Sequence, residues 1–472
     1  MKRLHLLLSG MVIFSPILLM VLFPISPVAQ DILDANQTLQ SSSLDGNAGE
    51  SQALQLLLDY EPWRGDLWER LGRVLLDDGK YGEAIDAFQM SREKGGLSGE
   101  GEIWLADALI SNENYTEAKD LLRQVSVEQK ALFKLWQIVI LQRRIGDVYG
   151  AESTLLSAHF LYPEDEEISF LLGLMVSTTQ PDSAVRFLSA PMNLSDNELQ
   201  LRDALVTTIE SSGETLASSD RFRQIGQVLS TFDEWDVAAQ AFHSAVTTDP
   251  ENALNWILLA EAQQQLEVNA FESVTRALAL DPGNEIVNGL SGLYYRRQGK
   301  YELALIYLQR ASAIDPAKSV WVIEIGNTYQ ETGNLELAYE YFIKAVNLNP
   351  DDWATWKALA VFCFTFNYEI QETGLLAARK ALALNPESPV LTDLLGTGLM
   401  LVGDYDSAER FLLEAEKMDP NQSAILIHLG QLKVLQQEYE SAREYLRAAM
   451  EFAPSNRLRE LANQLLREIS GK

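Results

Sequence analysis

The amino-acid sequence predicts an all-α protein built as a solenoid of stacked helical hairpins. One observation is a series of prolines separated by 32, 34, 34, 36, 34 and 34 residues. Most of them follow Asp or Asn, and a proline disfavours helical conformation in the residue before it. Each such pair therefore ends one helix and allows the next to begin. The series is Pro250, Pro282, Pro316, Pro350, Pro386, Pro420 and Pro454.

A second observation is that small and large apolar residues recur at fixed positions between the prolines. Apolar residues three and four apart form one stripe on each helix, and small residues let two helices approach closely. A single hairpin cannot bury its own apolar face, so neighbouring hairpins must stack. Two of the periods read Ile225-Gly226, Leu229, Ala238, Phe242, Ala245, Pro250 and Ile325-Gly326, Tyr329, Ala338, Phe342, Ala345, Pro350. Two more read Leu395-Gly396, Leu399, Ala408, Leu412, Ala415, Pro420 and Leu429-Gly430, Lys433, Ala442, Leu446, Ala449, Pro454.

This pattern resembles the tetratricopeptide repeat, a helix–turn–helix unit of about 34 residues. Trp68, Leu71, Gly72, Ala84 and Phe88 match the family pattern in the first clear repeat, and the resemblance extends from about residue 51 to 470. It implies a right-handed superhelical solenoid. It also implies that the first helices line a concave face that binds a peptide or partner segment.

The amino-terminal segment, residues 1–30, is predicted to be a signal-anchor or a signal peptide. Lys2 and Arg3 precede a mostly apolar run from Leu4 to Phe23. At about 1.5 Å per residue the run reaches roughly 30 Å, enough for one membrane crossing. It exceeds the usual signal-peptide core of about 7–15 residues, which favours an anchor, and cleavage after Ala29 is the alternative. We expect an extracytoplasmic body, either membrane-anchored or, after cleavage, secreted or periplasmic.

The repeat pattern fades between Pro181 and Asp220, where Ser195 introduces an extra helix. We expect this stretch to interrupt or bend the array. A closing amphipathic helix should shield its last apolar face. The predicted order is a disordered tether at 31–50, an N-terminal array at 51–191, an irregular helical insert at 192–218, a C-terminal array at 219–456 and a capping helix at 457–472.

Two hairpins depart from the common length. Between Ala260 and Ala270 the connection is two residues shorter than its neighbours and lacks the usual glycine turn. From Phe364 to Leu376 the connection is two residues longer.

Composition and motifs exclude several function classes. The chain has 37 Lys and Arg against 67 Asp and Glu, a net charge of −30, which disfavours nucleic acid as a partner. Its one cysteine, Cys363, allows neither an intramolecular disulfide nor a Cys-rich metal site. Neither HExxH, a P-loop, GxSxG nor a dinucleotide fingerprint occurs. We therefore predict no catalytic activity, no cofactor and no metal, and we interpret Cys363, His159 and His428 as packing residues.

The candidate partner-binding residues are those that the resemblance places on the concave face. Several are apolar where folding does not require it, so the groove over residues 286–434 is expected to accept an extended or helical segment with apolar side chains. The alternative is that the superhelix closes and buries these residues against each other. The residues are Leu293, Ile323, Asn327, Lys357, Val361, Phe364, Asp393, Met400, Ile427 and Gln431.

These features together predict a non-catalytic, membrane-tethered, extracytoplasmic scaffold that binds protein or peptide segments. The membrane is contacted through the N-terminal helix only. One alternative is a regulatory or assembly subunit of an envelope, secretion or polysaccharide-export enzyme complex, which rests on family analogy. Another is a self-associating structural protein.

Overall fold

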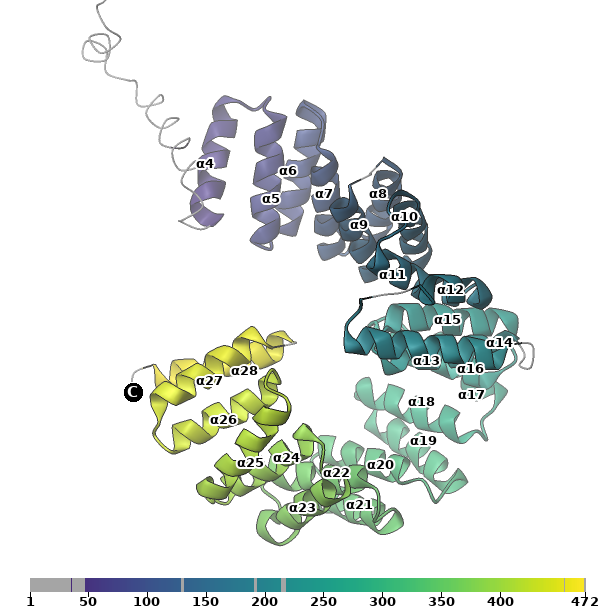
Figure 1. Ribbon diagram of the computed structural model, residues 1–472, viewed down its shortest axis with the longest axis vertical. Coiled ribbons are helices and arrows are strands. Elements are labelled where there is room, and N and C mark those ends of the chain that lie inside the picture. Colours follow the sequence, from purple (N-terminus) through teal and green to yellow (C-terminus); the bar gives the residue numbers. More distant parts are fainter. Residues whose placement is uncertain are drawn as a thin grey trace, which may run out of the picture. The chain divides into compact units, whose positions relative to one another are not determined.

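The computed structural model describes residues 35, 47–128, 131–190, 193–213, 218–453 and 455–470 (Figure 1). In this part of the chain every regular element is helical and no strand occurs. The predicted signal or anchor segment lies outside the described residues, as does most of the predicted tether. No helix among the described residues combines the length and apolarity that a bilayer crossing requires.

The chain forms two compact units, residues 1–248 and 249–472. The boundary follows Thr248, so the hairpin at 218–248 belongs to the N-terminal unit and not to the array after it. The helices of this unit are α4 (Asn47–Tyr60), α5 (Gly65–Asp77), α6 (Tyr81–Lys94), α7 (Gly99–Ser111), α8 (Tyr115–Glu128), α9 (Leu132–Arg144), α10 (Val148–Leu161), α11 (Glu166–Ser177), α12 (Pro181–Leu188), α13 (Asp196–Ser212), α14 (Ser218–Thr231) and α15 (Trp235–Thr248).

The C-terminal unit contains six hairpins and a closing helix. We call the members of each hairpin its first and second helix. The hairpins are α16 (Ala253–Gln265) with α17 (Phe271–Leu280), α18 (Glu285–Arg297) with α19 (Tyr301–Ile314), α20 (Ser319–Glu331) with α21 (Leu335–Leu348), α22 (Trp353–Thr365) with α23 (Leu375–Leu384), α24 (Pro389–Leu401) with α25 (Tyr405–Met418) and α26 (Ser423–Leu435) with α27 (Tyr439–Glu451), followed by α28 (Asn456–Ile469).

The small and large residues of the sequence pattern meet inside each hairpin. A side chain at Gly72 would place its Cβ 2.7 Å from the ring of Phe88, and one at Gly226 would lie 2.6 Å from Phe242. Both phenylalanines are fully buried. The glycine in the first helix thus makes room for the aromatic ring of the second helix, so the two positions recur together.

The tryptophans of the pattern bind the prolines. The indole Nε1 of Trp256 donates to the carbonyl oxygen of Pro250 at 2.8 Å, and Trp356 donates to Pro350 at 2.7 Å. Trp68 and Pro62 make the same bond at 3.1 Å. This bond ties the start of a first helix to the turn before it.

Both hairpins of unusual length are accommodated locally. The longer connection after α22 forms a π-helical turn, η1 (Ile370–Gly374), preceded by Glu369 in the left-handed region at φ 47°. The shorter connection between α16 and α17 places Glu267 at φ 58° and is followed by a second helix of only 10 residues.

The expected extra helix is present as α13. Its N-terminus is a capping box: the Ser195 hydroxyl accepts from the backbone N–H of Glu198, and the Glu198 carboxylate accepts from that of Ser195. This helix lies between the short α12 and α14. The hairpin α14–α15 then contacts α10 and α11, earlier in the same unit.

Candidate partner-binding face

The first helices of the C-terminal unit lie on the inner side of its curvature. Successive first helices from α16 to α26 contact each other, whereas successive second helices in the described part of this unit make at most marginal contact. A row of helices curves toward the side on which its members are closer. In Figure 1, α20, α22 and α24 accordingly lie inside α21, α23 and α25.

The exposed residues of these first helices form a stripe along each helix. Val320 and Val361 are 45% and 41% exposed. Ile286 and Val390, which like Val320 lie in the first turn of their helices, are also exposed. Leu401 and Leu435 are exposed in the last turn. The repeat pattern marks only the middle turns of each first helix. The sequence therefore predicted Val361 as a partner-binding residue but not the other five. Extending the stripe by one turn at each end would have found the others.

We define the first-helix face by these residues and by the predicted residues that keep some exposure. Val361 is exposed, and Leu293, Ile323, Asn327, Lys357 and Gln431 are half-buried. The first-helix face comprises Ile286, Leu293, Val320, Ile323, Asn327, Lys357, Val361, Val390, Leu401, Gln431 and Leu435.

Four of the predicted residues are buried. Phe364, Met400 and Ile427 are 9%, 8% and 2% exposed, and Asp393 is also buried. The reason is the helical rotation: a residue three positions after the exposed stripe is turned by about 60° around the axis. Phe364 follows Val361 by three and faces the next first helix. There a Cβ at Gly398 would lie 2.3 Å from its ring.

Two arginines near the first-helix face are neutralised by acids from adjacent first helices. Arg296 binds Glu324 at 2.9 Å and Glu331 at 2.7 Å, and Arg297 binds Glu261 at 2.8 Å. Asn327 donates its side-chain amide to Glu324 at 3.2 Å. The two arginines are therefore already engaged. Lys357 forms no ion pair with a described residue and lies over the Trp353 ring, its Nζ 5.9 Å from the ring centroid, so this face offers mainly apolar contact and a single cation.

Asp393 forms an ion pair with His428 in place of facing a partner. The distance from Asp393 Oδ1 to His428 Nδ1 is 2.7 Å. Burial lowers the pKa of His428, but the hydrogen bond and charge of Asp393 outweigh that effect and raise its pKa above the usual value. His428 was predicted to be a packing residue, and its pairing with Asp393 adds an electrostatic link between α24 and α26.

Lys433 occupies the position that holds Tyr329 or Leu399 in other repeats. It is buried, and its ammonium donates to Glu409 at 2.6 Å and to Glu438 at 2.9 Å. Burial lowers the pKa of Lys433, while these two carboxylates more than compensate and raise it. The repeat thus accepts a cation in its core because Glu409 of the preceding hairpin and Glu438 of the same hairpin neutralise it.

The described residues offer no cluster of His, Cys, Asp and Glu suited to a metal ion. Cys363 is fully buried, and burial with the nearby Glu369 raises the pKa of its thiol to about 12. Its thiolate form is scarce at neutral pH, so Cys363 is a packing residue in this structure.

Models of the tetratricopeptide repeat match residues 69–130, 287–318, 323–352 and 399–465. The chain belongs to the tetratricopeptide-repeat family. Repeats of this family form protein-interaction scaffolds that bind protein or peptide partners. No curated protein matches the chain.

Several solved structures have a similar arrangement of helices. Yeast Tom70 is 14% identical, with 86% of this chain and 96% of that chain covered and a TM-score of 0.46. A tetratricopeptide repeat protein from Parabacteroides merdae is 18% identical over 54% of this chain and 99% of that chain, with a TM-score of 0.42. The APC/C hetero-tetramer Cut9–Hcn1 is 15% identical over 95% of this chain and 98% of that chain, with a TM-score of 0.40.

Proposed function

We propose that this protein is a non-catalytic scaffold whose first-helix face binds extended or helical protein segments with apolar side chains. The observation that supports it is the row of exposed aliphatic residues, Ile286, Val320, Val361 and Val390, on successive first helices. Contiguous exposed apolar patches mark interaction sites. Asn327 at the middle of the face is engaged with Glu324, and Lys357 lies over the Trp353 ring.

The proposed partner is a segment with apolar side chains and not an acidic tail. A tail rich in carboxylates needs several free cations, but Arg296 and Arg297 are each paired with glutamates. Among the described residues of the first-helix face, Lys357 alone offers a cation, and it lies over the Trp353 ring. An apolar side chain needs only a hydrophobic surface to cover. Burying one Val or Leu side chain contributes about 1.5–3 kcal/mol, so three or four anchors spread over the face suffice for a specific, reversible complex.

The proposal is tested by the double variant Val320→Asp, Val361→Asp. Both side chains are exposed, so the helices should form normally while the partner segment loses its apolar contact. The matched control is Leu376→Asp, Leu413→Asp, which changes equally exposed residues of the second helices α23 and α25. Partner capture in native extracts should be lost in the first variant and kept in the control. Equal capture by both variants would refute the first-helix face as the binding site.

We further propose that the body is tethered to a membrane and lies outside the cytoplasm. The support is the sequence: Lys2 and Arg3 before the apolar run Leu4–Phe23, and the acidic charge of the remainder. Mass spectrometry of the mature N-terminus distinguishes an anchor, which keeps Met1 or its neighbour, from a signal peptide cleaved after Ala29. Protease protection in intact cells tests the location. The role as a subunit of an envelope, secretion or export complex depends on this location.

A second candidate function is self-association, which an apolar stripe on α10 favours. Tyr149, Leu156 and Phe160 follow one another at intervals of seven and four residues, and Phe160 is 85% exposed. Light scattering of wild type against Leu156→Ser, Phe160→Ser tests it. A dimer that the substitutions dissociate supports this function, and a monomeric wild type contradicts it.

A further inference from the structure

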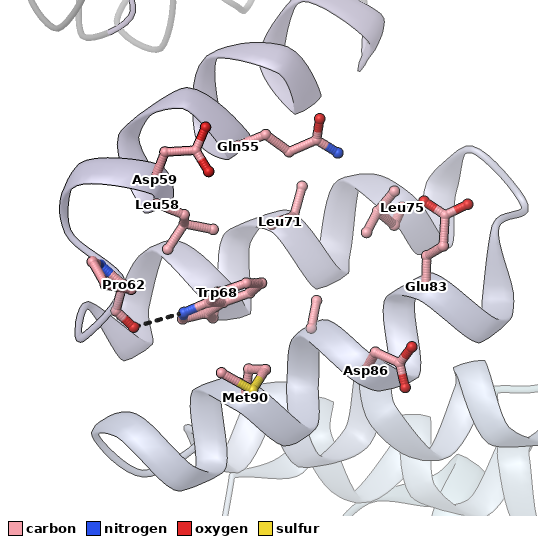
Figure 2. Close-up of a pocket in the computed structure, with 11 residues that line it drawn as sticks. Gln55, Leu58, Asp59, Pro62, Trp68, Leu71, Leu75, Glu83, Asp86 and Met90 are labelled. Carbon is pink, nitrogen blue, oxygen red and sulfur yellow. Dashed lines mark hydrogen bonds between the residues drawn. The ribbon is translucent and has the colours of Figure 1, made fainter.

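The first three described helices enclose a groove that is separate from the first-helix face. Its volume is about 600 Å³, within the range of ligand sites (Figure 2). Trp68, Leu71 and Leu75 of α5 form the floor. One wall is α4 with Leu58 and Asp59, and the other is α6 with the lining residues Glu83, Asp86, Ala87 and Met90.

The groove arises from three helical stripes that converge. On α6 the lining residues Glu83, Asp86 and Met90 are three and four positions apart, so they share one face. The same holds for the lining residues of α4 and α5. Leu58, Leu71 and Leu75 are buried, and Trp68 and Met90 are half-buried. The result is an apolar floor between two walls that each present a carboxylate.

The carboxylates of the groove have no ionic partner among the described residues. Asp59, Glu83 and Asp86 are exposed, and none of them forms an ion pair with a residue that the structure describes. Other acids of the same helices are paired: Glu50 binds Arg70 at 2.6 Å and Asp77 binds Arg73 at 3.1 Å. The arginines of α5 therefore face away from the groove.

We propose that this groove binds a basic segment of a partner protein that carries an apolar anchor flanked by Lys or Arg. The anchor would cover Trp68 and Met90, the half-buried apolar side chains that line the groove above the buried Leu71. One flanking cation would pair with Asp59 on α4 and the other with Glu83 and Asp86 on α6. Lys and Arg stems pack on apolar surface while their charged heads reach an acidic rim, and the Trp68 ring also attracts a cation.

The net charge of the chain is not by itself the reason for proposing a basic partner segment in this groove. The chain carries −30 overall, so any basic ligand is attracted to it from a distance. The groove adds a local feature to this attraction, because it combines carboxylates on opposite walls with an apolar floor. The proposal concerns the N-terminal unit and stands independently of the first-helix face.

Fluorescence anisotropy tests the proposal with the full chain in detergent. The probe is a fluorescein-labelled synthetic peptide with Lys flanking a central Leu pair, and its counterpart has Glu in place of Lys. In Asp59→Asn, Glu83→Gln, Asp86→Asn the Lys peptide should bind about tenfold more weakly than in wild type, because three charge pairs are lost. The matched control, Glu93→Gln, Glu117→Gln, Glu302→Gln, removes the same charge from exposed positions and should bind within about twofold of wild type.

Two further variants keep the proposal falsifiable. Met90→Ser should weaken the Lys peptide several-fold at unchanged charge and helicity, because the anchor loses apolar contact. Lys2→Ser, Arg3→Ser should leave binding unchanged. Equal weakening by both charge triples, or no effect of Met90→Ser, would overturn the proposal. Tighter binding by Lys2→Ser, Arg3→Ser would assign the groove to the chain's own N-terminus and overturn the partner assignment.

Discussion

Arg143 and Asp236, 93 residues apart in the sequence, form a two-pronged ion pair in the N-terminal unit. Arg143 Nε lies 2.7 Å from Asp236 Oδ2, and Nη2 lies 2.8 Å from Oδ1. Glu234 accepts from the same guanidinium. Arg143 lies in the last turn of α9, and the two acids flank the start of α15. This cluster therefore fastens the hairpin α14–α15 to a hairpin that is remote in the chain.

Replacing Arg143 should therefore destabilise the N-terminal unit. Arg143→Met leaves Glu234 and Asp236 half-buried without their cation, and we expect a loss of about 1–3 kcal/mol in the free energy of unfolding. Arg144→Met is the control, because Arg144 is half exposed and pairs at the surface with Asp107. It should cost under about 1 kcal/mol. Urea denaturation measures both, and equal losses would contradict the fastening role.

The pair His428–Asp393 should make stability depend on pH. The folded-state pKa of His428 is raised above its ordinary value of 6.5. The contribution is therefore fully present below 6.5 and is lost as the pH rises through the raised folded-state pKa.

The urea midpoint of His428→Gln should consequently lie below that of wild type in acid and approach it in alkali. The difference in acid should correspond to roughly 0.5–1 kcal/mol, since the imidazole is partly exposed. Asp393→Asn removes the cause and should abolish the pH dependence of the difference. A difference that grows toward high pH would contradict this sign.

The close contact between Phe364 and Gly398 should be sensitive to a single methyl group. Gly398→Ala places a Cβ against the Phe364 ring, at 2.3 Å if nothing moves, and should cost about 2–3 kcal/mol. Phe364→Leu alone should cost about 1–2 kcal/mol. In the double variant the losses should not add, because the smaller side chain makes room for the methyl group. Additive losses in thermal denaturation would show that the two residues do not pack together.

At left-handed turn positions, removing a glycine should destabilise the protein and introducing one should stabilise it. Gly333 has φ 77° and a Cβ there would meet open space, so Gly333→Ala isolates the backbone strain and should cost about 1 kcal/mol. Gln437 occupies the corresponding turn at φ 64°. Gln437→Gly should stabilise by a few tenths to about 1 kcal/mol. If the denaturant midpoints of both variants shifted in the same direction relative to wild type, this prediction would be contradicted.

Local features of the fold could be read from the sequence. Pro350 and Trp356 are six residues apart because the indole of Trp356 donates a hydrogen bond to the carbonyl oxygen of Pro350. Gly72 and Phe88 recur together because they are in contact within one hairpin. Ser195 and Glu198 form a cap that their spacing predicts. Each of these depends on residues that are close in the chain or in neighbouring helices of one repeat.

What the sequence could not predict depends on contacts between separate hairpins. Phe364 and Met400 occupy positions that the repeat pattern leaves open to a partner. The burial of Phe364 follows from the rotation of α22 and from Gly398 on α24, the next first helix, on which Met400 also lies. The link from Arg143 to Asp236 spans several repeats, and one acidic residue among 67 cannot be chosen by pattern.

The central claim is that the first-helix face of the C-terminal unit holds the partner segment, and site-specific photocrosslinking tests it most directly. A photoreactive amino acid is placed at Val361, with Leu413 on the second helix α25 as the control, and cells are irradiated before lysis. We predict a discrete crosslinked protein from Val361 that is absent from Leu413. Crosslinks from Leu413 alone, or the same product from both positions, would contradict the claim.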